Sequence, residues 1–111
     1  CMIDLKQNAK ALTFSIAVDA WMSHLKDSGK INHWRMMRRK LNLASENHSD
    51  FLLEIEVNDL AQLDLAFRES GKQDEDVARL HRAVHDLIGN SSIGLYRSYP
   101  DPERSERMAL I

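Results

Sequence analysis

The chain contains a single cysteine among 111 residues, so it cannot form an internal disulfide. This suits a reducing compartment, and we expect the protein to be cytoplasmic. Long hydrophobic runs are missing as well, because the longest candidate, ALTFSIAVDAWM, is interrupted by Asp19 and falls short of the roughly 20 residues that span a bilayer. The first residues lack the basic and then apolar pattern of a secretory leader. We therefore expect no membrane partner.

An excess of positive charge is also lacking, since 15 Lys and Arg stand against 17 Asp and Glu. A nucleic-acid-binding surface needs a field that attracts phosphates. The one basic run, Arg38 to Lys40, has the acidic residues Glu46, Asp50 and Glu54 nearby to neutralise it. We expect no nucleic-acid partner. Hydrophobic residues still make up 43% of the chain, which is enough for one globular core.

Hydrophobic spacing divides the chain into alternating strands and helices. The patterns predict a strand at 1–6, a helix at 9–26, a strand at 51–57, a helix from 58 that Gly71 interrupts and that resumes at 74–88, and a strand at 91–99. Asn8 is the expected cap of the first helix, and Asn58 or Asp59 that of the second. With a further strand at 31–42, the order is βαββαβ, which is the ferredoxin-like plait. With a helix there, the sheet would lack one strand.

The apolar stripes of the helices predict which side each one buries. The stripe of the first helix has residues at spacings of three and four: Ala11, Phe14, Val18, Trp21, Met22 and Leu25. Leu12 and Ile16 widen it, so we expect this helix to bury more than one side. In the strand at 51–57, one face is expected to carry Phe51, Leu53, Ile55 and Val57. In the second helix Leu60, Leu63 and Phe67 are expected to face inward. In the third the expected buried residues are Val77, Leu80, Val84, Leu87 and Ile88.

The stretch HWRMMRRKLN, residues 33–42, is unusual for a strand because neither face is purely polar. One face carries Trp34, Met36, Arg38 and Lys40, and the other carries His33, Arg35, Met37, Arg39 and Leu41. Both faces should therefore be partly covered. Right-handed crossovers place both helices on one face of the sheet. A second copy of the chain is then the simplest cover for the other face.

The turn-like residues ASENHSD predict a hairpin between this strand and FLLEIEV. A turn centred near Glu46 and Asn47 sets Arg39 opposite Glu54 and Arg35 diagonal to Glu56. A register shifted by one residue pairs Arg38 with Glu54 instead. The sequence leaves this choice open.

The βαββαβ order, the chain length and the segments WRMMRRKLNLA, FLLEIEVNDLAQLDLAF and YPDPERSERMALI resemble the dimeric α/β-barrel superfamily. The most similar group is an uncharacterised bacterial family of small stand-alone barrel proteins. The resemblance implies an α+β fold, a four-stranded antiparallel sheet with helices on one face, and a homodimer in which two sheets meet. It implies one domain at 1–100 and a tail at 101–111 that could pack on the partner subunit.

The superfamily includes haem enzymes, but their motifs fit this chain poorly. Haem-degrading members pair an Asn of the first strand with a Trp of the third strand, where this chain has Asp4 and no Trp in FLLEIEV. Haem peroxidases need a His over the sheet face, whereas His81 and His85 fall on a helix. These two His are spaced as metal ligands can be, but no third ligand accompanies them. We expect no cofactor and no metal site.

The candidate site is the space under the sheet. Six side chains could line it and bind a small organic molecule: Asp4, Arg35, Arg39, Glu54, Glu56 and Tyr96. Carboxylates beside Arg suit proton transfer or the binding of an acidic ligand. The alternative is a non-catalytic homodimer in which ion pairs fill this space. The sequence does not decide whether the protein is an enzyme.

Overall fold

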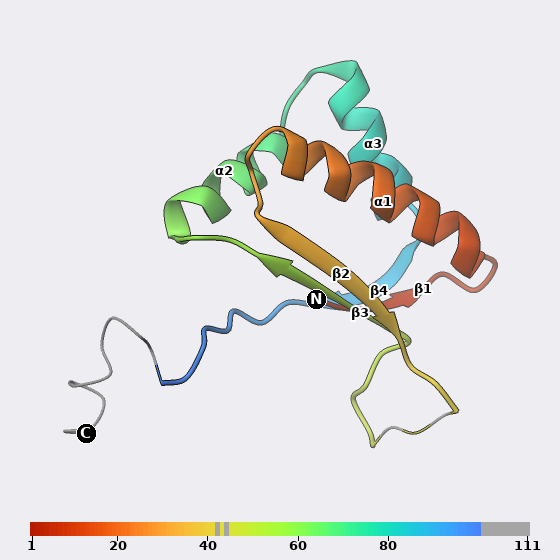
Figure 1. Ribbon diagram of the computed structural model, residues 1–111. Coiled ribbons are helices and arrows are strands. Elements are labelled where there is room, and N and C mark those ends of the chain that lie inside the picture. Colours follow the sequence, from red (N-terminus) through yellow and green to blue (C-terminus); the bar gives the residue numbers. More distant parts are fainter. Residues whose placement is uncertain (42, 44, 101–111) are drawn as a thin grey trace.

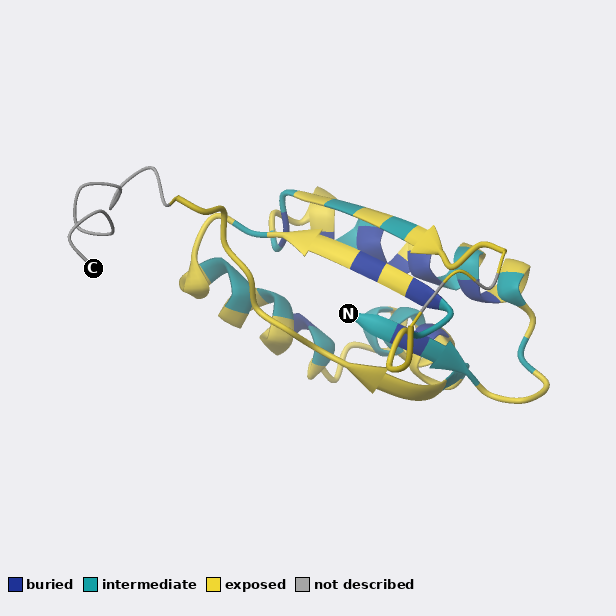
Figure 2. Cartoon of the chain, turned by 90° about the horizontal axis from the view of Figure 1, so that it is seen from below, coloured by how far each residue is buried: buried dark blue, intermediate teal, exposed yellow. Residues whose placement is uncertain are grey.

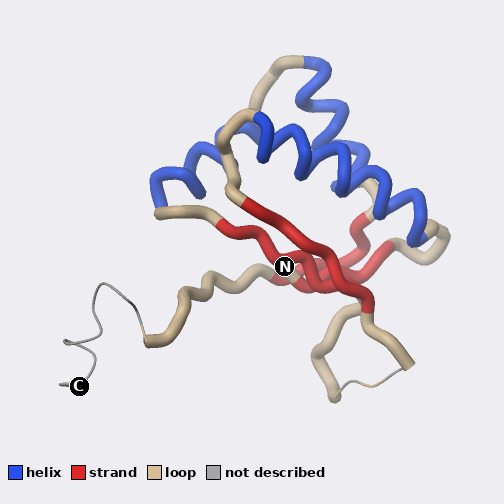
Figure 3. Tube along the Cα trace, in the orientation of Figure 1, coloured by secondary structure: helices blue, strands red, loops and turns tan. Residues whose placement is uncertain are grey.

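A computed structural model describes residues 1–41, 43 and 45–100, and these form two layers (Figure 1). One layer is an antiparallel sheet of β1 (Met2–Leu5), β2 (His33–Arg38), β3 (Phe51–Glu56) and β4 (Ile88–Ser92), in the order β2-β3-β1-β4. The other holds α1 (Ala11–Asp27), α2 (Leu60–Ser70) and α3 (Glu75–His85). Within the described residues all helices lie on the same face of the sheet (Figure 3). The predicted α+β plait is confirmed.

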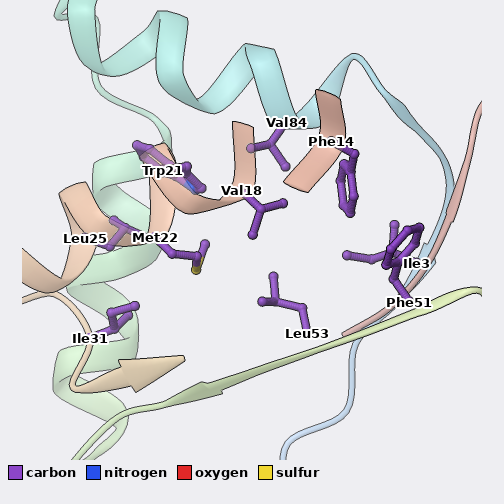
Figure 4. Packing of buried hydrophobic residues seen from close by; sticks show 10 residues of the cluster. All are labelled: Ile3, Phe14, Val18, Trp21, Met22, Leu25, Ile31, Phe51, Leu53 and Val84. Carbon is purple, nitrogen blue, oxygen red and sulfur yellow. The ribbon is translucent and has the colours of Figure 1, made fainter. Parts of the chain in front are cut away.

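The core lies between α1 and the sheet (Figure 4). The buried residues of α1 follow the predicted spacing of three and four: Phe14, Val18, Trp21, Met22 and Leu25. Alternate strand residues meet them, namely Ile3 of β1 and Phe51 and Leu53 of β3. The ring centroids of Phe14 and Phe51 lie 5.2 Å apart at 55°. This distance and tilt are favourable for an aromatic pair.

Helix α1 differs from its prediction at its first turns. It begins at Ala11 after Lys10 rather than after Asn8, and no side chain among the described residues caps it. Leu12 and Ile16 are 73% and 63% exposed. Within one chain, α1 therefore buries one side only.

Helix α2 is rotated relative to its prediction. Asp59 is its cap, as predicted, because the Asp59 carboxylate accepts a hydrogen bond from the Gln62 backbone N–H at 2.8 Å. Leu63 is half-buried, but Leu60 and Phe67 are exposed, and Glu69 is buried. Ala66 and Glu69 are three positions apart, so they lie on one side of α2, and this side faces inward.

Helix α3 ends three residues earlier than predicted, at His85, and β4 begins at Ile88 rather than at 91. Val84 is buried, and Val77 and Leu80 are half-buried, as predicted. Gly89 is a residue of β4, and a Cβ there would lie 3.0 Å from the Leu5 carbonyl oxygen. Its role is close approach to β1 and not the termination of a helix.

Strand β2 is shorter than the predicted 31–42, but its faces are as predicted. Trp34 and Met36 point to the helices, opposite Ile55 and Leu53. Both predicted registers are wrong, because Arg35, and neither Arg39 nor Arg38, lies opposite Glu54. The true register differs from the first prediction by an even number of residues, which leaves every side chain on the same face. The hydrophobic pattern therefore could not distinguish the two.

Candidate functional site

The face of the sheet turned away from the helices, here called the outer face, is open in the part of the chain that the structure describes (Figure 2). Cross-strand pairs assign to it Met2 and Asp4 of β1, His33, Arg35 and Met37 of β2, and Leu52, Glu54 and Glu56 of β3. Arg39 and Asp50 continue the ladder beyond β2 and β3, because the Arg39 N–H donates to the Asp50 carbonyl at 2.8 Å. Five of the six predicted site residues therefore lie on or at the end of one face.

The strongest polar contact on the outer face joins Arg35 and Glu54. Arg35 donates from Nε to Glu54 Oε2 at 2.7 Å and from Nη2 to Oε1 at 3.3 Å. This hydrogen bond is the main cause that lowers the pKa of Glu54, and the same contact raises the pKa of Arg35. Glu54 is therefore a charged carboxylate at neutral pH, suited to accept a hydrogen bond.

A second polar group lies four residues further along the strands. Arg39 donates from Nη2 to Asp50 Oδ1 at 3.0 Å and from Nη1 to the His48 carbonyl at 3.0 Å. The backbone N–H of Asp50 donates to Asp4 Oδ1 at 2.9 Å. Arg39 and Asp4 are thus linked through Asp50, which the sequence analysis named as a neutralising charge near the basic run but did not include in the candidate site.

Between the two polar groups lies an apolar row, formed by Met37, Leu52 and Met2. Met37 stands opposite Leu52, and Leu52 stands opposite Met2. Met37 and Leu52 are 37% and 39% exposed. A sheet face that meets only water is normally polar. The apolar row therefore marks a surface suited to contact with another molecule.

Glu56 and Tyr96 complete the predicted set, and only Glu56 shares the outer face. Glu56 stands opposite His33 at the far end of β2. Tyr96 follows β4 and its side chain is almost wholly exposed. A single chain thus brings Asp4, Arg35, Arg39, Glu54 and Glu56 to one face, and leaves Tyr96 apart from them.

A cluster in the helical layer was not predicted. Glu69 of α2 is 3% exposed, with Oε2 at 2.7 Å from Nε2 of His24 in α1 and Oε1 at 2.7 Å from Nζ of Lys72. The Lys72 contact is the main cause that lowers the pKa of Glu69, and it raises the pKa of Lys72. No sequence pattern links Glu69 to a histidine 45 positions earlier.

His81 and His85, the possible metal pair of the sequence analysis, belong to a row of neighbouring aromatic rings in the helical layer. Trp21 lies 5.6 Å from His24 and 5.4 Å from His81, and His81 lies 5.8 Å from His85. Burial, and then the charge of His85, lower the pKa of His81. Within the described residues no group of three or more His, Cys, Asp or Glu is arranged to hold a metal ion.

Two open hollows, of about 450 and 370 Å³, lie near the turn between α2 and α3 and are lined by residues between 70 and 82. They are on the helical side of the molecule, remote from the predicted site. The outer face is one wall of the predicted chamber, and the opposite wall would come from a second molecule.

Comparison with known proteins assigns the chain to a family. All of residues 1–111 match the model of a family described as "Family of unknown function (DUF6614)", and the chain belongs to this family. The searches of curated proteins and of solved structures found no match. Among the described residues, every helix is too short or too polar to cross a membrane.

Proposed function

We propose that this member of a family of unknown function forms a homodimer through its outer face, and that the chamber between the two sheets binds a small organic acid. The observation that carries the proposal is the position of the apolar row between two Arg–carboxylate pairs on an uncovered sheet face. The resemblance to dimeric α/β barrels points to the same assembly.

The composition of the outer face supports self-association. In a two-fold interface one patch meets its own copy, so it must be self-complementary. Arg35 and Glu54 supply both signs of charge on one patch. Burial of the apolar row in an interface would stabilise the dimer by about 25 cal/mol for each Å² of apolar surface removed from water.

The free donors of Arg35 supply the ligand chemistry. A guanidinium has five N–H donors, and two of them are used on Glu54. The remaining donors suit the two oxygens of a ligand carboxylate. The apolar body of the ligand would then rest on Met37 and Leu52, and Glu54 would accept a hydrogen bond from a ligand hydroxyl.

The alternative is a non-catalytic homodimer whose ion pairs fill the chamber. The contacts of Arg39 favour it, because Asp50 and the His48 carbonyl already engage both of its Nη atoms. Under this alternative the polar groups between the sheets serve assembly alone.

Thermal unfolding with a panel of small carboxylic acids, each paired with its neutral amide, separates the two functions. A ligand present at 100 times its Kd stabilises the folded state by about 2.7 kcal/mol, so the Tm should rise with concentration for an acid and not for its amide. Arg35→Gln should abolish the rise. Arg79→Gln, which removes an exposed ion pair on α3, is the matched control and should retain it. A dimer whose Tm none of these acids raises would contradict the proposed binding of an acid and favour the alternative.

A further inference from the structure

Strand β2 lies at one edge of the sheet, and its side away from β3, here called the β2 edge, is free in the part of the chain that the structure describes. In the order β2-β3-β1-β4, β2 pairs with β3 alone (Figure 1). Its ladder with β3 is regular from His33↔Glu56 to Arg38↔Phe51. At the opposite edge, by contrast, the register of β4 on β1 shifts beside Leu5. A regular, uncovered edge strand can pair with one more strand.

The hydrogen bonds of β3 show which backbone groups of β2 are unpaired. The Leu53 N–H donates to the Cys1 carbonyl at 2.8 Å, so the backbone of Leu53 faces β1 and that of its two neighbours faces β2. These neighbours stand opposite Arg35 and Met37. The residues of β2 that alternate with Arg35 and Met37 therefore turn their N–H and C=O groups to the β2 edge: Trp34, Met36 and Arg38.

Two of these three residues have apolar side chains that the single chain covers incompletely. Trp34 and Met36 point to the helices and pack against the core, but both are only half-buried. Residues that stand directly opposite each other on paired strands have their side chains on the same face of the sheet. Apolar side chains of an added strand would therefore lie beside Trp34 and Met36 and cover them further.

Positive charge is concentrated on β2 and its continuation, at Arg35, Arg38, Arg39 and Lys40. Arg35 and Arg39 are paired with carboxylates. Arg38 and Lys40 have no carboxylate partner among the described residues, and Arg38 lies over the ring of Phe51 at 5.6 Å from its centroid. Like charges on paired strands are unfavourable and opposite charges favourable. The β2 edge should therefore repel a second β2 and attract an acidic strand.

We propose that the β2 edge binds an extended acidic segment of another protein, which adds to the sheet as an antiparallel strand. The segment has apolar residues opposite Trp34 and Met36, and acidic residues opposite Arg38 and along the outer face. In this mode of recognition the main-chain hydrogen bonds provide affinity, and alternate side chains provide specificity. The inference does not depend on the proposed homodimer, because it concerns the edge of the sheet and not the outer face.

Amide hydrogen exchange on the whole chain tests the pairing residue by residue. The probe is the peptide acetyl-Glu-Glu-Glu-Val-Glu-Val-amide, whose two Val would lie opposite Met36 and Trp34. In the free chain the N–H groups of Trp34, Met36 and Arg38 should exchange fast, and peptide at ten times its Kd should slow them about ten-fold. Those of Arg35 and Met37, already paired with β3, should change less.

Two outcomes of this experiment would overturn the inference. If the peptide leaves the exchange of Trp34, Met36 and Arg38 unchanged, no strand has been added to β2. If these amides exchange slowly in the chain without peptide, the β2 edge is already covered, for example by a second copy, and is not a site for an acidic partner.

Matched N-methylated peptides separate strand pairing from attraction by charge alone. Methyl groups on the amides of the second, fourth and sixth peptide residues remove the donors that would face β2, so binding should be lost. Methyl groups on the first, third and fifth residues lie on the side away from β2, so binding should be retained. Equal binding of the two methylated peptides would contradict the proposed pairing.

A charge reversal tests the preference for an acidic partner. Arg38→Glu, at an exposed position, should raise the Kd of the peptide about ten-fold, because an attraction is replaced by a repulsion. Arg79→Glu on α3 alters the net charge of the chain equally and should change the Kd less than about two-fold. Circular dichroism checks that both variants are folded. Equal weakening in both variants would show that net charge, and not the β2 edge, attracts the peptide.

Discussion

The two faces of the sheet are made by alternate residues of the same strands, yet they differ in what covers them. Leu53 is 4% exposed beneath α1, whereas its neighbour Leu52 is 39% exposed on the outer face. The inner face is apolar throughout its centre, and the outer face sets an apolar row between ion pairs. The inner face thus stabilises one chain, while the outer face has the composition of a contact surface.

The largest expected effect is on the inner side of the core. Phe14→Ala should lower the free energy of unfolding by about 3–5 kcal/mol, because the Phe14 side chain is fully buried against Phe51. Urea unfolding measures the loss. Leu12→Ala, two residues earlier on the exposed side of α1, should cost less than about 0.5 kcal/mol. A comparable loss for Leu12→Ala would mean that a second molecule also buries the other side of α1.

The next effect is on the outer face and on association. Leu52→Glu places a charge in the centre of the proposed interface, so the dimer dissociation constant should rise about 100-fold, which is about 2.7 kcal/mol. Analytical ultracentrifugation measures this, and circular dichroism should show the fold retained. Leu65→Glu, at a partly exposed position of α2, is the control that should leave association unchanged. Equal effects of the two variants would remove the distinction between the outer face and the rest of the surface.

A smaller effect compares a buried carboxylate with an exposed one. Glu69→Gln should cost about 1–2 kcal/mol at pH 7, because it removes charged hydrogen bonds to His24 and Lys72. The folded pKa of Glu69 is lowered, so its contribution is complete above the unfolded value of about 4.3 and is lost as the pH falls through the folded value.

The pH dependence provides the check on Glu69. The variant should lose less stability than the unmodified chain when the pH falls from 5 to 3, as measured by urea unfolding at each pH. Glu54→Gln on the outer face is the comparison, and at pH 7 it should leave the free energy of unfolding of the single chain unchanged within error. If Glu69→Gln and Glu54→Gln lowered the free energy of unfolding equally, burial of Glu69 would not make its contacts stronger than those of Glu54.

The smallest effect on stability is expected for Arg35→Gln, because the Arg35–Glu54 pair is solvated in the single chain. The informative measurement is the pKa of Glu54 by NMR titration of its carboxyl carbon. It should rise toward the usual value for glutamate when the Arg35 hydrogen bond is lost. Arg79→Gln should leave the pKa of Glu54 unchanged. An unchanged pKa in Arg35→Gln would show that Arg35 does not form the hydrogen bond that lowers the pKa of Glu54.

The sequence analysis was most successful where one side of an element is buried by its own chain. The stripe from Phe14 to Leu25 and the alternation of Phe51 and Leu53 were predicted correctly. In each element the buried residues follow a single spacing along the chain, that of a helix in α1 and that of a strand in β3. It failed at α2, where Leu60 and Phe67 are exposed and Glu69 is buried. There α2 is followed by a short turn to α3, and Glu69 contacts His24 of α1. Apolar spacing along the helix predicts neither contact.

For the candidate site, the sequence placed Asp4, Arg35, Arg39, Glu54 and Glu56 on one face but assigned the wrong partners. Arg35 binds Glu54, and Arg39 binds Asp50. The alternation of side chains fixes the face of each residue and leaves the register free to shift by two or four positions. Tyr96 was expected in the same space on the strand predicted at 91–99, but β4 is Ile88–Ser92 and Tyr96 lies beyond its end.

Local patterns left open which face of β2 carries each arginine, and the structure decided it. They were sufficient for the order of elements, the inner core of α1 and β3, and the two sets of residues that alternate along β2. These depend on periods of 2 and 3.6 residues, which are properties of neighbours along the chain. Only the folded chain decided the partner of each charge, the rotation of α2 and the burial of Glu69 beside His24 and Lys72. Those contacts join residues far apart in sequence, and their geometry is set when the helices and the sheet pack together.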